Sequence, residues 1–238
     1  MPRIKKRRQH QPFLVRLLWL IVQLTIALIL LSILLVLPWR WLPPPTTSFM
    51  LQTAVRSGHL YHYRWTPYSD ISPYMALAAI ASEDQRFPDH HGFDLEAIEQ
   101  AYTDYQQGGD LRGASTITQQ VAKNLYLWSG RSLARKGLEA WFTLLIEVFW
   151  SKQRILEMYL NVAQFGTQEF GVEAASRAFF DKPASELTAD ESALLAAVLP
   201  APELYQVTQP SEEVWQHQSW ILQQMYQLGE LDYLKKVQ

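Results

Sequence analysis

The residues from Glu83 to Asp94 read Glu83-Asp84-Gln85-Arg86-Phe87-Pro88-Asp89-His90-His91-Gly92-Phe93-Asp94. They directly follow segment 74–82, an alanine-rich, apolar stretch that predicts a buried helix. A carboxylate at the end of such a helix is partly removed from water, which raises its pKa towards the range of a general base. Glu83 is therefore a candidate base. The alternative is that Glu83 and Asp84 are solvated acids in the loop that ends the helix.

A second polar stretch follows along the chain and reads Gly113-Ala114-Ser115-Thr116-Ile117-Thr118-Gln119-Gln120-Val121-Ala122-Lys123-Asn124. Ser115 or Thr116 is a typical N-cap, and the apolar residues at 117, 121 and 125 fall on one face of a helix. Backbone N–H groups at a helix start favour phosphate, and polar side chains at 116, 119 and 120 surround this one.

The N-terminus has a different character from the rest of the chain. No acid precedes Asp70, and six Lys and Arg lie within the first sixteen residues. Residues 17–37 carry no charge over about 32 Å of helix, which is enough to cross a bilayer. A cleaved signal peptide would have a shorter apolar core and a small-x-small site, whereas this run ends at Leu37-Pro38-Trp39-Arg40-Trp41. The sequence therefore predicts one membrane span, with the basic end cytoplasmic and the body outside the cytoplasm.

Positive charge is concentrated in one part of this body. Residues 41–238 hold 14 Lys and Arg against 23 Asp and Glu, a net of −9, but residues 112–154 hold seven against two, a net of +5. Such a patch indicates an anionic partner, and phosphate on a lipid suits a membrane-tethered domain better than nucleic acid does. The alternative is a solvated helix face with scattered ion pairs. Arg135 and Lys136 precede Glu139 by four and three residues, so one carboxylate can hold both cations.

The body is predicted to be one mostly α domain. The chain has 238 residues, of which 48% are hydrophobic and 18% charged, so it is not disordered. It has no cysteine, which excludes disulfides, thiol nucleophiles and thiolate metal sites. Helices are expected at 95–106, 132–150, 151–161, 192–199 and 211–228, the fourth behind a capping box at 188–191. The Tyr-rich segment 59–65 is the best strand candidate.

Five motifs, in one order across residues 83–180, resemble the peptidoglycan glycosyltransferase family, glycosyltransferase family 51. They are E-D-x-x-F-x-x-H-x-G-F-D at 83–94, G-x-S-T-I-T-Q-Q-x-x-K-N at 113–124, R-K-x-x-E at 135–139, I-L-E-x-Y-L-N at 155–161 with Phe165-Gly166, and Gly171-Val172-Glu173-Ala174-Ala175-Ser176 leading to Phe179-Phe180. The whole chain is similar to the monofunctional, membrane-anchored members. The same domain begins the class A penicillin-binding proteins, but no S-x-x-K or K-T-G transpeptidase motif occurs here.

The resemblance implies a lysozyme-like, mostly α glycosyltransferase domain behind one N-terminal transmembrane helix. It divides the chain into a cytoplasmic tail at 1–16, the transmembrane helix at 17–37, a linker and membrane-proximal jaw at 38–60, and the glycosyltransferase domain at 61–238. The enzyme would sit in the cytoplasmic (inner) membrane with its domain on the periplasmic side. It would polymerise lipid II, the acceptor, onto a lipid-linked glycan strand, the donor. The reaction would form β-1,4 linkages with inversion and release undecaprenyl diphosphate.

Site residues also follow from the resemblance and from the residue chemistry. Glu83 would take the proton of the acceptor 4-hydroxyl, and Glu139 would orient the cations rather than take that proton. The diphosphate needs cations and hydrogen-bond donors, which Lys123, Arg135 and Lys136 supply. The residues expected to contact substrate are Asp84, Phe87, His90, Ser115, Thr116, Gln119, Gln120, Lys123, Asn124, Arg135 and Lys136. Phe179 stands where Tyr is expected and Ala114 where Gly is expected, which puts local loop geometry in question.

Other readings stay open at this point. Adjacent His90 and His91 point apart without a third ligand, so we expect no metal site there. No cofactor is expected to be required, and a divalent cation (Mg²⁺ or Mn²⁺) accompanying the substrate is left open. The expected partners are lipid II, the lipid-linked strand, the membrane and proteins of cell-wall synthesis or division, but not nucleic acid. A lytic muramidase of similar fold and a catalytically idle scaffold are the competing functions.

Overall fold

The computed structural model describes residues 13–108, 115–130 and 132–237. Its helices are α1 (Phe13–Val36), α2 (Ser48–Ser57), α3 (Pro73–Glu83), α4 (Leu95–Gln106), α5 (Ile117–Tyr126), α6 (Leu133–Phe149), α7 (Lys152–Val162), α8 (Val172–Phe180), α9 (Ala189–Val198) and α10 (Glu212–Gln227). Short 3-10 helices are η1 (Leu37–Arg40), η2 (Tyr68–Asp70), η3 (Ala184–Glu186) and η4 (Glu230–Lys236). Strands β1 (His62–Tyr63) and β2 (Glu169–Phe170) pair in parallel. The mostly α fold expected from the sequence is confirmed.

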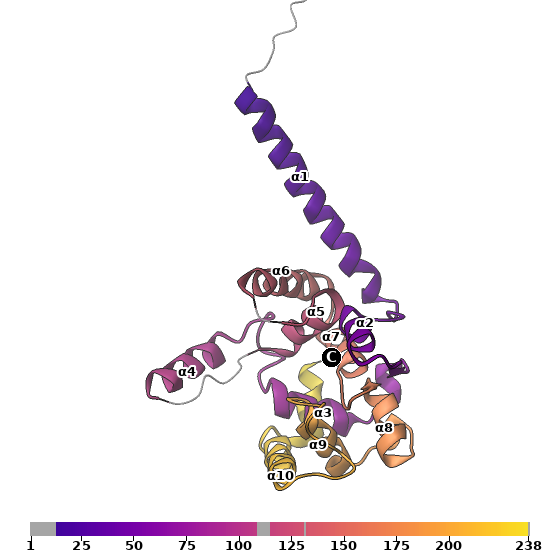
Figure 1. Cartoon of the computed structure of the whole chain (residues 1–238). Coiled ribbons are helices and arrows are strands. Elements are labelled where there is room, and N and C mark those ends of the chain that lie inside the picture. Colours follow the sequence, from indigo (N-terminus) through magenta and orange to yellow (C-terminus); the bar gives the residue numbers. More distant parts are fainter. Residues whose placement is uncertain (1–12, 109–114, 131, 238) are drawn as a thin grey trace, which may run out of the picture.

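The long helix α1 stands out from the body (Figure 1). Together with η1 it forms a 28-residue segment, Phe13–Arg40, with a mean hydropathy of 3.0, long and apolar enough to cross a membrane. Two tryptophan side chains of the body form hydrogen bonds with the C-terminal end of α1. The indole nitrogen of Trp141 on α6 donates to Ser32 Oγ at 3.1 Å, and that of Trp150 donates to the Val36 carbonyl at 3.2 Å. These two hydrogen bonds hold the body against the C-terminal end of α1.

The body divides into two groups of helices that meet around the end of α3. Helices α5, α6 and α7 pack together on the α1 side, with α2 against α5 (Figure 1). Helices α3, α9, α10 and η4 pack together on the far side. The core of the far group is the alanine-rich helix α3, in which the seven residues from Met75 to Ala81 are buried. Proline at the first position of α3 begins the helix, and the chain leaves it directly after Glu83.

One expectation differs from the structure, and two features were not expected. The predicted strand at 59–65 is reduced to His62–Tyr63, because only these residues meet the equally short β2. Segment 38–60, whose path the sequence left open, contains α2, whose N-cap Thr47 accepts from the Met50 amide at 3.1 Å. Helix α4 forms as predicted, but its apolar side chains are exposed, and it has no buried residue within the described parts of the chain.

Candidate active site

Glu83 lies at the last position of α3, where the buried helix meets a hollow in the surface. Its Oε2 accepts a hydrogen bond from Gln120 Nε2 of α5 at 2.7 Å, and its Oε1 accepts from Ser82 Oγ at 3.2 Å. Burial raises the pKa of Glu83 above its ordinary value, while the two hydrogen bonds and the nearby charges of His217 and Lys123 oppose the rise. The structure therefore agrees with the raised pKa that the end of an apolar helix predicts.

Two pockets flank this carboxylate. Pocket A has a volume of about 450 Å³ and is lined by Glu83 itself, by Ser115 and Thr116, and by residues of α4. Pocket B has a volume of about 370 Å³ and is lined by Gln120, Lys123 and other residues of α5, by Tyr159, and by the loop at 199–204. Because Glu83 lines pocket A and its partner Gln120 lines pocket B, the carboxylate lies between the two. Two separate ligands could thus reach one carboxylate.

A cluster of cations lies beside the pockets. Arg135 Nη1 donates to Glu139 Oε2 at 2.6 Å, and Lys136 Nζ binds the other oxygen of Glu139, as the three- and four-residue spacing predicts. Lys136 Nζ also lies 3.4 Å from Ser115 Oγ, at the edge of pocket A. Glu139 is 3% exposed, so its carboxylate is fixed by these two cations.

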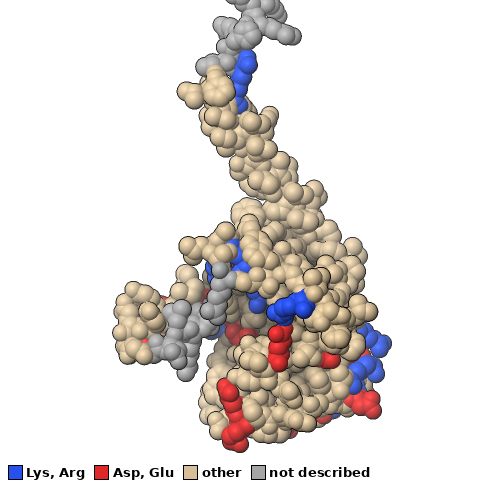
Figure 2. Space-filling view, in the orientation of Figure 1, with Lys and Arg blue, Asp and Glu red and all other residues tan. Residues whose placement is uncertain are grey.

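Lys123 completes the cluster from α5. Burial lowers its pKa below the ordinary value, and the charges of Arg135 and Lys136 lower it further, while Glu139 and Glu83 oppose the shift. In the described parts of the chain, no carboxylate lies within 4 Å of Lys123 Nζ; its neighbour is the ring of Phe49, 5.6 Å from the ring centre. In the space-filling view, Lys and Arg atoms lie along the upper edge of the hollow below α1, and Asp and Glu atoms lie at its lower edge (Figure 2). Among the described residues, Glu139 is the one carboxylate within 4 Å of the charged nitrogens of these three cations, so the cluster carries an excess of positive charge.

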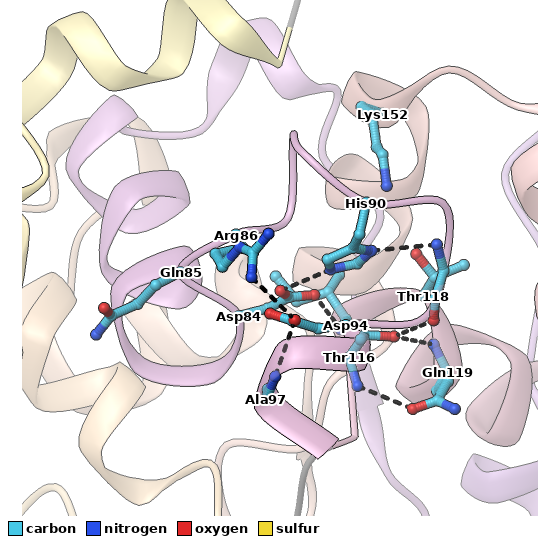
Figure 3. A network of polar contacts seen from close by, with 12 residues as sticks. Asp84, Gln85, Arg86, His90, Asp94, Ala97, Thr116, Thr118, Gln119 and Lys152 are labelled. Carbon is cyan, nitrogen blue, oxygen red and sulfur yellow. Dashed lines mark hydrogen bonds and ion pairs between the residues drawn. The ribbon is translucent and has the colours of Figure 1, made fainter. Parts of the chain in front are cut away.

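A buried network behind Glu83 fixes the loop that carries it (Figure 3). Asp84 Oδ1 lies 2.8 Å from His90 Nε2, and Asp84 Oδ2 accepts from the Ile117 amide at 3.0 Å. His90 Nδ1 accepts from the Gly92 amide at 3.1 Å, so Nε2 carries the proton that is donated to Asp84. Thr116 Oγ1 donates to the Gly92 carbonyl at 2.7 Å. The loop after α3 is therefore locked onto the start of α5.

The same network occupies the start of α5. Thr116 and Gln119 form a reciprocal capping box, and the Ile117 amide is held by Asp84. A phosphate at these amides would have to displace protein groups. The side-chain cations, rather than this helix start, are thus the groups that the structure leaves open to an anion.

The predicted site residues fall into four sets. Glu83, Asp84, Ser115 and Thr116 line pocket A, whereas Gln120, Lys123 and Asn124 line pocket B. Arg135, Lys136 and Glu139 form the cluster beside Ser115. Phe87, His90 and Gln119 are buried behind the site, with exposures of 0%, 8% and 5%. Asn124 is also buried, and its Oδ1 has no hydrogen-bond partner among the described residues although the side chain lines pocket B.

The structure leaves some of the predicted residues undescribed, and it places at pocket B two residues that no motif indicated. Ala114 and two cations of the basic segment, Arg112 and Arg131, lie outside the described residues. In the described parts of the chain, no group of three or more His, Asp or Glu is placed to hold a metal ion. Sequence reasoning did not find Arg56 and Glu203, which line pocket B from distant parts of the chain. Neither stands in a motif, so the sequence carried no signal for them.

Replacing Asp84 with Ala is expected to lower the free energy of unfolding by about 2–4 kcal/mol, because it leaves the buried Ile117 amide and His90 Nε2 without an acceptor. The exposed Asp89, in the same loop, is the matched control, and Asp89→Ala should stay within about 0.5 kcal/mol. Denaturant unfolding of both variants checks this. Equal losses in the two variants would show that the Asp84 network does not hold the loop.

Comparisons with known proteins place this arrangement in a family. A family model described as Transglycosylase matches residues 51–226, which is most of the chain. A biosynthetic peptidoglycan transglycosylase of Xanthomonas campestris pv. campestris is 50% identical over 210 residues, covering 86% of this chain and 85% of its own length. Proteins of the same name from Pseudomonas putida and Pseudomonas fluorescens are 52% and 49% identical over 211 residues, covering 87% of this chain and 89% and 88% of their own lengths. The chain therefore belongs to the peptidoglycan transglycosylase family and is a membrane-anchored peptidoglycan glycosyltransferase.

Proposed function

We propose that this enzyme extends a lipid-linked glycan strand with lipid II, forming β-1,4 linkages with inversion and releasing undecaprenyl diphosphate. The observation that carries the proposal is the placement of Glu83, which lies between two pockets and beside a cluster of cations. Such a site suits a reaction that joins two bound sugars and expels an anion.

In the proposed step, Glu83 accepts the proton of the acceptor 4-hydroxyl as its oxygen attacks the anomeric carbon of the donor. The bond between that carbon and the diphosphate oxygen breaks, and the diphosphate leaves with the electron pair. The anomeric configuration inverts because the nucleophile and the leaving group lie on opposite faces of the sugar. Burial supports this role, since a carboxylate with a raised pKa is a stronger base.

The cations serve the leaving group in this account. A diphosphate is already a good anion, so it needs positive charge and hydrogen-bond donors rather than a proton. Lys123 has no carboxylate of its own among the described residues, and Lys136 is half exposed, so both are open to phosphate oxygens. Glu139 is not suited to act as the base, because each of its oxygens is engaged by a cation. It positions Arg135 and Lys136 instead.

The remaining predicted residues divide by exposure. Ser115, Gln120 and Asn124 line the pockets and are proposed to bind substrate, with the unpartnered Asn124 Oδ1 accepting from a ligand hydroxyl or amide. Asp84 and Thr116 also line pocket A, but both are buried and engaged in the hydrogen-bond network behind Glu83. Together with Phe87, His90 and Gln119, we assign them to positioning the loop and α5.

The membrane geometry agrees with a lipid-linked substrate. Helix α6, which carries Arg135 and Lys136, is bound to the end of α1 through Trp141, so the cations lie on the side of the body nearest the membrane helix (Figure 1). We propose that α1 crosses the cytoplasmic membrane with its basic end inside and that the catalytic domain lies on the periplasmic side. The step needs no cofactor, and a divalent cation (Mg²⁺ or Mn²⁺) would have to bind largely through the diphosphate. Cell-wall synthesis or division proteins remain proposed partners.

The test is polymerisation of labelled lipid II by the detergent-solubilised full chain. Polymer that a muramidase digests to disaccharide units, with one undecaprenyl diphosphate released per linkage, would support the proposed reaction. Shortening of preformed strands without polymer formation would instead identify a lytic muramidase. Lipid II binding without polymer would point to a scaffold.

Replacing Lys123 with Ala is expected to weaken binding of the diphosphate-linked substrate on the order of tenfold, because a charge-assisted contact is lost. The loss should be larger at low ionic strength, where the attraction is less screened. Binding of labelled substrate at two salt concentrations measures this, with the exposed Lys235→Ala as the matched control. The same loss with a glycan that lacks the diphosphate would mean that Lys123 does not contact phosphate.

A further inference from the structure

An ion pair joins the two sides of pocket B. Arg56 lies in the last turn of α2, and its Nη2 binds Glu203 Oε1 in the loop after α9, although the two residues are 147 positions apart. The other polar contacts of α2 run to the end of α5, where Ser48 Oγ and Gln52 Nε2 donate to the Leu127 carbonyl at 2.9 Å. In the described parts of the chain, Arg56–Glu203 is the only ion pair or hydrogen bond between α2 and the loop at 199–205.

The pair stands at the rim of the pocket rather than on a remote surface. Both side chains line pocket B together with Lys123 and Gln120, the neighbour of Glu83. Glu203 also lines an adjoining pocket of about 230 Å³, which contains Phe179. Arg56 also lines a pocket of about 350 Å³ formed mostly by α2. The pair therefore stands where pocket B meets both neighbouring pockets.

The ion pair between Arg56 and Glu203 can break easily. The side chains of Arg56 and Glu203 are 56% and 47% exposed, and exposed ion pairs are weak and screened by salt. Arg56 lies in the last turn of α2, whereas Ser48 and Gln52 hold the earlier turns to the Leu127 carbonyl. Rotation of the Arg56 side chain away from Glu203 therefore leaves those contacts in place.

We infer that Arg56 and Glu203 form a clasp across pocket B, which opens to admit the growing glycan strand and closes over it between additions. This inference rests on the proposed function, because it takes the strand to be the occupant of pocket B. The clasp does not touch the reacting atoms; it retains the polymer, so that successive additions occur before the strand is released. It thus sets product length more than the rate of a single addition.

Charge-reversal variants distinguish a clasp from a surface ion pair that has no role in elongation. Arg56→Glu and Glu203→Arg each place like charges opposite one another, and each is expected to shorten the mean product on the order of threefold. The initial rate of disaccharide incorporation should change less than the length does. The double variant Arg56→Glu/Glu203→Arg restores an attractive pair and should restore the length. Asp232→Lys, which breaks the exposed pair with Lys235 away from the pockets, is the matched control.

The outcomes are distinct from failure of the proposed function. If the wild-type chain makes no polymer from lipid II, the proposed function fails first. If it makes polymer and all three variants give wild-type lengths, or if the double variant is as short as the single ones, the clasp is overturned. A higher initial rate without shorter products would also overturn it, because the pair would then only obstruct entry.

A covalent bridge between positions 56 and 203 provides a second test of the clasp. The sequence has no cysteine, so Arg56→Cys/Glu203→Cys introduces the sole pair of thiols. Bridging the two thiols with a short bis-maleimide, which forms a thioether with each, during elongation should keep labelled strand on the immobilised enzyme through a high-salt wash, and bridging them beforehand should prevent strand binding. Equal retention with the bridged and unbridged enzyme would contradict the clasp.

Discussion

Glu83→Gln is expected to reduce polymerisation by roughly 10³-fold while the protein stays folded and still binds lipid II, since general-base contributions are of this order. The amide keeps the size of the side chain and can still accept from Gln120 Nε2, but it cannot take a proton. Single-turnover incorporation of labelled disaccharide measures the loss. Retention of wild-type turnover would remove Glu83 as the base.

The same variant should be more stable than the wild type at neutral pH. Burial raises the pKa of Glu83 in the folded protein, so ionising it costs folding free energy as the pH rises through that pKa. Glutamine removes this cost, and its advantage should shrink as the pH falls and the wild-type carboxyl becomes protonated. Thermal unfolding across pH checks this. A less stable Glu83→Gln protein would mean that lost activity reports misfolding rather than chemistry.

Glu139→Gln is expected to lower polymerisation on the order of 10²-fold, because the buried carboxylate that holds Arg135 and Lys136 loses its charge. Lys123 also loses a neighbouring anion that favours its charged form, so less positive charge remains to receive the diphosphate. We expect both the turnover rate and the affinity for the diphosphate-linked substrate to decrease. Initial rates of polymerisation and binding of the diphosphate-linked substrate measure it.

Glu147 supplies a matched control on the same helix. Its carboxylate accepts from Thr118 Oγ1 at 2.5 Å and from Lys152 Nζ at 2.9 Å, so Glu147→Gln also removes a paired and largely buried charge. It should cost stability but leave the rate per folded molecule within about twofold, because it lies apart from the cation cluster. If both variants lost activity equally, the special role of Glu139 would be refuted.

Local sequence patterns were enough to predict several helices of this molecule and one cluster of ion pairs. The apolar run after the basic tail predicted α1, the capping residues predicted the starts of α4, α5, α6 and α9, and helical spacing predicted the pairing of Arg135 and Lys136 with Glu139. These features depend on residues within one or two turns of each other. Propensity, periodicity and spacing therefore report them directly.

What the sequence did not reveal depends on distant contacts. The hydrogen bond from the Ile117 amide to the Asp84 carboxylate joins residues 33 positions apart, and no local pattern indicates it. Helix α2 is short, and its stabilising contacts come from the region after α5. The exposed apolar stripe of α4 also escaped prediction, since periodicity identifies an apolar face but not whether another element covers it.

The most direct test of the central claim is the acid limb of the pH profile of kcat/KM, which reports the essential base in the free enzyme. The account predicts an acid limb above the ordinary Glu pKa of 4.5, because burial raises the pKa of Glu83. It also predicts that Gln120→Met moves this limb to higher pH, since the 2.7 Å hydrogen bond from Gln120 holds the pKa down. Gln100→Met, in pocket A but bonded to Asp104, should leave the limb in place. Superimposable acid limbs in the wild type and Gln120→Met would contradict the assignment of Glu83 as the base.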